Sequence, residues 1–161
     1  MKHTFSLILT GLLVLSLQST VAREDASDGA EAPAAFDAEL AAALGADAYG
    51  MARYVMVLLK AGDRTGIDDA RAAELQRGHL ENIRRLAEAG HLLQAGPFID
   101  GGDLRGIFIF DVETVEAARE LTASDPAIEA GLLRAEYKPW YGSAAIRKIG
   151  EIHERIAREN P

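Results

Sequence analysis

The feature that most constrains this chain is an amphipathic stretch of about five helical turns between residues 72 and 90. Plotted at about 100° per residue, its apolar side chains gather on one side of a helix, whereas its charged side chains and Asn82 are assigned to the other side. A helix of this kind packs its apolar face against another element. The apolar face consists of Ala72, Leu75, His79, Leu80, Ile83, Leu86 and Ala87.

His79 is the chemical exception on this face, because a leucine or an alanine is the residue expected at that position. An imidazole that points inward is a group whose proton affinity is tuned by its surroundings. The sequence leaves two interpretations open. His79 is either a core histidine bonded to a backbone carbonyl, or a proton-transfer group in a pocket.

Turn signals and short apolar runs divide the middle of the chain into four strands and two helices. Gly90 ends the amphipathic helix. The order is strand, helix, strand, strand, helix, strand, which predicts a ferredoxin-like α+β fold with an antiparallel sheet and its helices on one face. The predicted strands are 53–60, 91–95, 106–112 and 132–138, the second helix is 115–122, and a further helical turn follows residue 126.

Two of the predicted strands are apolar at consecutive positions, in 53–60 and 107–110. A sheet with one solvated face should instead alternate apolar and polar residues. Because the helices cover only one face, the other face needs a partner. We expect a second copy of the chain, packed sheet to sheet as a homodimer that leaves a small cavity for His79.

Residues 1–22 are typical of a secretory leader. Lys2 gives a basic start, and the apolar run 7–17 is too short to span a bilayer comfortably. Thr20 and Ala22 place small residues at the third and first positions before a cut. We therefore expect cleavage after Ala22 and a periplasmic or secreted protein with no membrane attachment, an uncleaved anchor being the alternative.

The remaining chain is predicted to contain an acidic, alanine-rich tether over 23–50, a domain over 51–142 and a helical extension over 143–161. The chain has no cysteine, which excludes disulfides and thiol-linked lipids. Its formal net charge of −8 and the lack of a basic cluster disfavour nucleic acid and anionic membranes as partners.

Several short segments, taken in order, resemble the YciI-like (YCII-related) family over residues 53–141. The resemblance implies a dimeric α+β barrel and a histidine and an aspartate that act as an acid/base pair in a pocket, at the positions of His79 and Asp125. Family members differ in activity, so no substrate is implied. The segments are Tyr54-Val55-Met56, His79-Leu80, 90–98, Gly106, Asp125-Pro126, Gly131 and Lys138-Pro139-Trp140.

Asp125 has a structural interpretation of its own. An aspartate directly before a proline is a good helix N-cap, with Pro126 at the first helical position. Both roles are compatible, because a capping carboxylate keeps a second oxygen for an imidazole N–H.

Three further residues are candidates for ligand binding: Gly96 and Pro97, which primarily form a turn, and Tyr137, which is otherwise a rim residue. No metal-ligand spacing, phosphate loop or activated nucleophile is present, so we expect neither a metal nor a cofactor. The leading hypothesis is an exported, cofactor-free isomerase or lyase that acts on a small aromatic or cyclic compound. The alternative is a noncatalytic ligand-binding or interaction module with a structural histidine.

Overall fold

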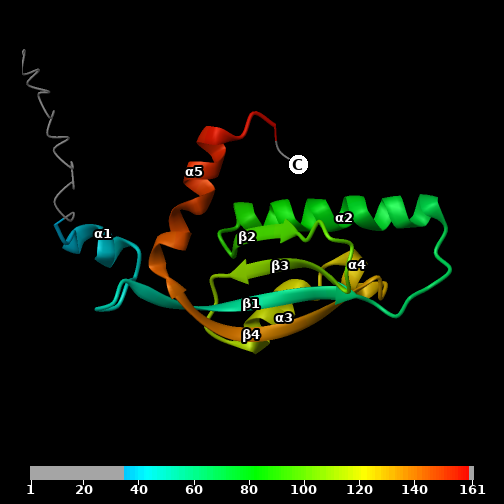
Figure 1. Ribbon diagram of the computed structural model, residues 1–161, viewed down its shortest axis with the longest axis horizontal. Coiled ribbons are helices and arrows are strands. Elements are labelled where there is room, and N and C mark those ends of the chain that lie inside the picture. The colour runs from blue at the N-terminus through cyan, green and yellow to red at the C-terminus, as the bar shows by residue number, and fades with distance from the viewer. Residues whose placement is uncertain (1–34, 160–161) are drawn as a thin grey trace, which may run out of the picture. The chain divides into compact units, whose positions relative to one another are not determined.

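The structure, a computed structural model, describes residues 35–159, so the predicted leader and the first part of the predicted tether lie outside the described residues. A four-stranded sheet in the order β2-β3-β1-β4 organises the chain (Figure 1), and every neighbouring pair is antiparallel. This confirms the predicted ferredoxin-like α+β fold. The strands are β1 (Met51–Ala61), β2 (Leu92–Pro97), β3 (Leu104–Phe110) and β4 (Leu133–Ser143).

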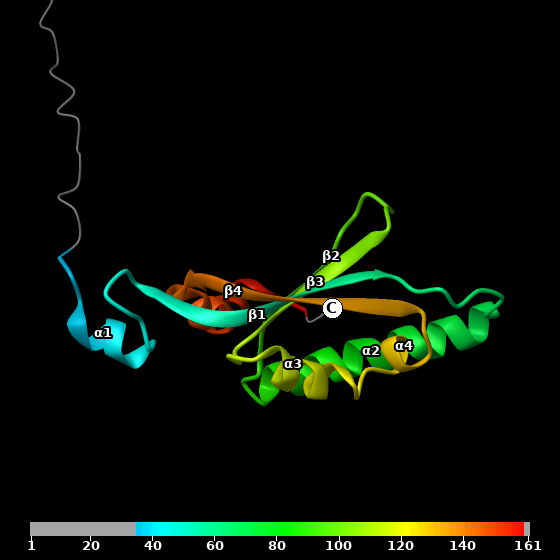
Figure 2. The ribbon, with the colours of Figure 1, turned by 90° about the horizontal axis from the view of Figure 1, so that it is seen from below.

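Three helices, α2 (Asp69–Glu88), α3 (Val115–Thr122) and α4 (Pro126–Glu129), lie on one side of this sheet (Figure 2). Each begins at a residue whose side chain accepts a backbone N–H: Asp68 for α2, Thr114 for α3 and Asp125 for α4. Gly90 follows α2 with φ +76°, a left-handed conformation that favours glycine. The helix ends are therefore encoded locally.

Strand β1 supplies apolar side chains to both faces of the sheet. Val55, Val57 and Leu59 face the helices and pack in the main core. Tyr54 and Ala52 face the other way, into a second cluster. The consecutive apolar positions of β1 therefore serve two separate cores.

The second face of the sheet is covered only in part. Met56, Leu58 and Ile107 on this face are half-buried, whereas Val57 between them is fully buried. Leu58 and Ile107 are directly paired across β1 and β3. These residues form an apolar patch, called here the open sheet face.

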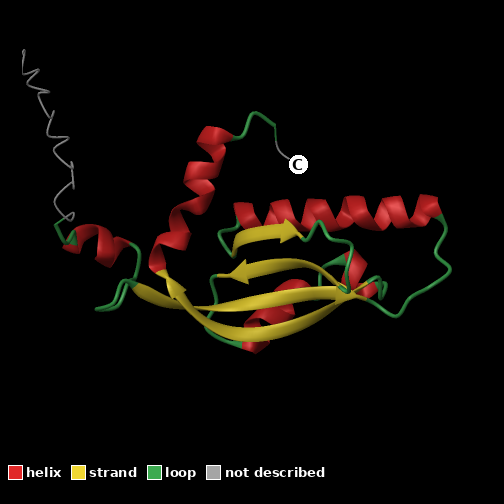
Figure 3. Ribbon diagram, in the orientation of Figure 1, coloured by secondary structure: helices red, strands yellow, loops and turns green. Residues whose placement is uncertain are grey.

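Figure 3 shows α1 (Ala38–Ala43) beyond the start of β1, and the 3₁₀ helix η1 (Ala144–Lys148) and α5 (Ile149–Ile156) continuing from the end of β4. Arg147 binds both oxygens of Asp111, at 2.6 and 2.9 Å, and the carbonyl oxygen of Leu44 at 2.5 Å. Leu44 and Ala46 also pack against the second cluster. The last part of the predicted tether is thus held against the domain.

The predicted apolar face of α2 needs one correction. Asn82, which was assigned to the polar side, is buried, whereas Leu80 is 37% exposed. The buried side of α2 is therefore centred on Leu75, His79, Asn82 and Leu86. Within residues 35–159, no helix has the length and apolar character needed to cross a bilayer.

Candidate active site

Asp125 caps the short helix α4, as the Asp-Pro pair predicts. Its Oδ1 accepts the backbone N–H groups of Ala127 at 3.0 Å and Ile128 at 3.3 Å. Pro126 occupies the first turn, where its missing N–H costs nothing. The side chain is fully buried. One carboxylate oxygen is thus committed to the backbone.

The other oxygen of Asp125 faces His79. The His79 Nδ1 atom lies 2.7 Å from Asp125 Oδ2, and His79 retains only 7% of its exposed surface. On the sheet side, the imidazole is stacked against the ring of Phe108, with 5.8 Å between centroids and 27° between planes. The structure therefore brings together the two residues that the sequence singled out as a pair.

Asn82 is the third member of this cluster, and the sequence analysis missed it. Its Nδ2 donates to Asp125 Oδ2 at 3.3 Å, and its Oδ1 accepts from Arg85 at 2.7 Å and Ser124 at 3.0 Å. These two donors fix the amide so that its N–H groups point toward the carboxylate. The helical angle is the signal that could have found it, because Asn82 lies only about 20° from Leu75.

The electrostatics of the cluster favour an ionised Asp125. Burial alone would raise the pKa of this carboxyl group, but the hydrogen bond and charge of His79, together with the Asn82 and Ile128 donors, hold the pKa below its usual value. An ionised carboxylate only accepts hydrogen bonds, so Nδ1 of His79 carries the proton. In the neutral imidazole, the lone pair is then on Nε2.

This Nε2 atom is not completely enclosed. Among the described residues, Nε2 has no hydrogen-bond partner. Every fully buried side-chain nitrogen or oxygen atom in that part of the chain does have a partner, so Nε2 is not fully buried. The exposed remnant of His79 therefore includes Nε2. A base with its lone pair at the edge of the cluster can take a proton from a bound molecule.

The other predicted site residues lie elsewhere. Gly96 and Pro97 end the edge strand β2, paired with Ile107 and Gly106 of β3. Tyr137 lies on β4, where its hydroxyl is 2.5 Å from Thr122 Oγ1 and its ring contacts the Arg119 guanidinium at 4.3 Å. No described hydrogen bond joins any of the three to His79, and their binding roles stay predictions.

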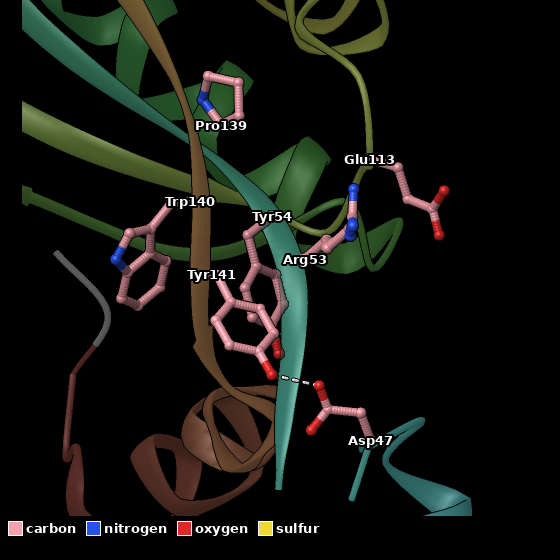
Figure 4. A pocket seen from close by; sticks show the side chains of 7 residues that line it. All are labelled: Asp47, Arg53, Tyr54, Glu113, Pro139, Trp140 and Tyr141. Atoms are coloured by element: carbon pink, nitrogen blue, oxygen red, sulfur yellow. Dashed lines mark hydrogen bonds between the residues drawn. The ribbon is translucent and has the colours of Figure 1, made fainter. Parts of the chain in front are cut away.

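Two of the pockets in the described part of the chain have linings that include neither His79 nor Asp125. One, of about 440 Å³, lies beside the paired ends of β1 and β4, where the hydroxyl of Tyr141 donates to Asp47 (Figure 4). The other, of about 640 Å³, includes Tyr137. Residues 35–159 hold no cluster of three or more His, Cys, Asp or Glu side chains suited to a metal ion.

The family model for the YCII-related domain matches residues 52–141, more than half of the chain. The chain belongs to the YCII-related domain family. This domain therefore includes all four strands of the sheet except their outermost residues, as well as the His79–Asp125 cluster. The predicted resemblance to this family is confirmed.

No curated protein matches the YCII-related chain significantly. A similar solved structure is 5-chloro-2-hydroxyhydroquinone dehydrochlorinase from Burkholderia phenoliruptrix in complex with 2,5-dihydroxybenzoquinone. It is 22% identical in sequence, covers 53% of this chain and 92% of its own, and superimposes with a TM-score of 0.39.

Proposed function

We propose that this protein is an exported, homodimeric acid/base catalyst in which His79 transfers a proton and Asp125 orients and stabilises its ring. The observation that carries the proposal is the buried 2.7 Å contact between His79 Nδ1 and Asp125 Oδ2, with Nε2 left without a hydrogen-bond partner among the described residues. Such a pair needs no cofactor. The reaction class is isomerisation or elimination in a small aromatic or cyclic compound.

In the proposed reaction, Nε2 of His79 takes a proton from a ring carbon next to a carbonyl group of the substrate. The C–H electron pair moves toward the carbonyl oxygen and forms an enolate, while the imidazolium is stabilised by ionised Asp125. In isomerisation, the imidazolium returns the proton to another carbon. In elimination, the enolate electrons expel an anionic leaving group, and the proton passes to water.

The open sheet face supports the dimer. An apolar patch formed by Met56, Leu58 and Ile107 is more stable when a second copy covers it. The charges beside the patch are already paired: Glu136 contacts Lys60 at 2.5 Å and Lys138 at 2.7 Å. These lysines lower the pKa of Glu136 to about 2. Glu136, Lys60 and Lys138 would therefore present charges that are already paired to a second copy of the chain.

One observation favours a noncatalytic alternative. His79 is 93% covered, and it lines neither the 440 Å³ nor the 640 Å³ pocket. A histidine that only joins α2 to α4 would have the same contacts. In that case the protein binds a ligand or partner without transforming it.

Incorporation of deuterium from the solvent distinguishes the proposed catalyst from a noncatalytic binding protein. The protein is incubated in D₂O with a panel of cyclic ketones and hydroxylated aromatic compounds, and deuterium incorporation is measured by mass spectrometry. The catalyst should label at least one compound above the buffer rate, and His79→Ala should remove this labelling. Labelling that persists in His79→Ala, or none with any compound, would contradict catalysis by His79.

Asp125→Asn is the matched positioning variant. Its Oδ1 can still cap α4, but its amide N–H groups would face Nδ1. The imidazole then keeps the proton on Nε2 and loses the outward lone pair. We expect a folded protein with the labelling rate reduced by roughly 10²-fold or more. ¹⁵N NMR of the imidazole should show the change of tautomer.

A further inference from the structure

The hairpin that joins β2 to β3 leaves the plane of the sheet. Figure 2 shows it rising on the side that faces away from α2, α3 and α4, which is the side of the open sheet face. Residues 98–103 form the loop at its tip. At its base, the Ala61 N–H donates to the Asp103 carbonyl oxygen at 2.8 Å, so the end of β1 holds the hairpin in place. The hairpin is therefore a projecting segment beside the open sheet face.

The tip of the hairpin carries two adjacent apolar side chains that the described residues leave uncovered. Ile99 is 99% exposed and Phe98 is 43% exposed. Single exposed apolar residues are common in proteins. These two, however, are adjacent at the end of a hairpin that rises on the same side of the sheet as the apolar open sheet face (Figure 2). Both surfaces are stabilised when another molecule covers them.

The tip of the hairpin is also acidic. Asp100 and Asp103 form no ion pair within 4.0 Å among residues 35–159. One oxygen of Asp100 accepts the N–H of Gly102 at 3.2 Å, which shapes the turn. Arg105 is the basic residue of the segment 98–105, so two aspartates against one arginine leave an excess of one negative charge there.

The opposite charge lies along β4, on the open sheet face. Strand side chains alternate between the two faces of a sheet. The side of β4 that faces the helices carries the core residues Leu133, Ala135 and Tyr137. Arg134, Glu136 and Lys138 therefore point to the other face, together with Lys60, which pairs with Arg134 across the strands. These four residues are termed the basic row, because one glutamate against three cations leaves an excess of two positive charges.

Two-fold symmetry can bring the tip of one hairpin onto the basic row of a second copy. When two such sheets pack face to face about an axis parallel to their strands, β2 at one edge lies over β4 at the edge of the partner sheet, and equal strand ends stay together. The tip and the basic row belong to the same strand end, because Lys60 pairs with both Leu104 and Arg134. Packed sheets lie about 10 Å apart, so a hairpin that rises on this side meets the second sheet.

We infer that the β2–β3 hairpin binds a second copy of this chain, with Asp100 and Asp103 against the partner's basic row and Phe98 and Ile99 against the partner's open sheet face. This inference rests on the proposed homodimer and names the segment that holds it together. Because the axis is two-fold, each dimer contains the contact twice. The opposite charges also favour this orientation of the two sheets over one in which two basic rows meet.

Cross-linking between two single-cysteine variants tests where the hairpin lies. The chain has no cysteine, so Ile99→Cys and Arg134→Cys each introduce one thiol. The two purified proteins are mixed, left to exchange subunits and treated with a short bismaleimide. The mixture should give a covalent dimer, whereas neither variant alone should, because its two identical thiols lie at opposite edges of the dimer. Arg84→Cys, at an exposed position of α2, is the control for Arg134→Cys and should not link to Ile99→Cys.

Both substitutions in one chain distinguish a second copy from the chain's own sheet. The double variant Ile99→Cys/Arg134→Cys should give linked dimers on a denaturing gel. A link within one chain would show that the hairpin covers its own basic row, and would overturn the inference. The inference also fails if the wild type sediments as a dimer but the mixed variants give no covalent dimer, and in that case the proposed homodimer stands.

Charge reversal tests the electrostatic part of the contact. Asp103→Lys and Arg134→Glu should each weaken the dimer at low salt by roughly fivefold or more, since each substitution acts twice in a dimer. Both together in one chain reverse the two sides of the contact and should restore the dimer affinity to within about threefold of the wild type. Glu81→Lys, at an exposed position of α2, is the matched control and should leave the affinity unchanged.

Equal dimer affinity in Asp103→Lys and Glu81→Lys would contradict the proposed contact and leave the homodimer intact. A monomeric wild type would overturn both the contact and the homodimer. Deuterium labelling that depends on His79 is a separate measurement, so proton transfer can be judged independently of either result.

Discussion

Gly78 and Pro126 meet where α2 crosses α4, and a Cβ on Gly78 would lie only 2.8 Å from Pro126 Cγ. The next residue along α2 is His79, and the residue before Pro126 is Asp125. The absence of a side chain at Gly78 therefore lets the two helices approach closely enough for the 2.7 Å contact between His79 and Asp125.

Gly78→Ala is expected to destabilise the protein by about 1–2 kcal/mol. Overpacking costs roughly 1–3 kcal/mol, and the better helix propensity of alanine returns up to about 1 kcal/mol. Urea unfolding measures the change. The NMR signal of the His79 Nδ1 proton should also weaken, because the separation from Asp125 increases.

The matched control is Gly150→Ala in α5. No atom lies within 4 Å of a Cβ at this helical position. This variant should be neutral or stabilising by up to about 1 kcal/mol. If Gly78→Ala behaves in the same way, the close approach at Gly78 does not position the pair.

The lowered pKa of Asp125 predicts how the free energy of unfolding depends on pH. Because its pKa is lowered in the folded protein, its contribution is present above the unfolded pKa, about 3.9, and is lost as the pH falls through the folded value. The wild type should therefore lose stability below about pH 4. Asp125→Asn should lose less over this range, in urea unfolding measured from pH 7 down to pH 2.

Asp69→Asn serves as the control for this experiment, because Asp69 is exposed at the start of α2. Its acid dependence should follow that of the wild type. If the stability of Asp125→Asn falls with pH as steeply as that of the wild type and of Asp69→Asn, the ionised Asp125 carboxylate does not contribute to the loss of stability in acid.

Asn82→Leu tests the buried network. The substitution removes the acceptor for Arg85 and Ser124 and one donor to Asp125, so we expect a loss of about 1–3 kcal/mol. The pKa of Asp125 should rise toward its ordinary value, as measured by ¹³C NMR of the carboxylate. Gln76→Leu, at an exposed position of the same helix, should change the free energy of unfolding and the pKa of Asp125 much less than Asn82→Leu does.

Leu58→Glu tests the proposed dimer. A charge in the open sheet face would be buried without a partner between two copies, so the variant should sediment as a monomer and the wild type as a dimer. Arg84→Glu on the helix side should remain dimeric. A monomeric wild type would contradict the assembly.

Export is tested by the N-terminus of the mature protein. Expression of the full chain in a bacterial host that has a signal peptidase should yield, in the periplasm or medium, a protein that begins at Arg23. Intact mass measurement gives the cleavage site. A protein that retains residues 1–22 in the membrane fraction would support the anchor instead.

The order of strands and helices could be predicted because local signals mark each boundary, such as Gly90 after α2 and the Asp125 cap before α4. The end of β4 could not be predicted from local signals. The predicted strand ends at residue 138, whereas β4 runs to Ser143, because an edge strand tolerates Pro139, which cannot donate a ladder hydrogen bond.

The burial of Asn82 conflicts with its polarity but agrees with its helical angle, about 20° from Leu75. A buried amide is stable only when its hydrogen-bond groups are satisfied, and the partners Arg85, Ser124 and Asp125 come together only in the folded chain. The His79–Asp125 pairing could be predicted from the family resemblance, whereas the residues alone indicated only an inward-facing histidine and a helix-capping aspartate.

The divided carboxylate of Asp125 bears on how relatives should be compared. Because one oxygen holds the start of α4 whatever the other does, selection for a stable fold alone would keep a capping residue such as aspartate or asparagine at this position, with or without catalysis. A substitution of the histidine in the neighbouring helix has no such protection. Under the proposed function, the residue at position 79 is therefore the more informative marker of relatives that share proton transfer.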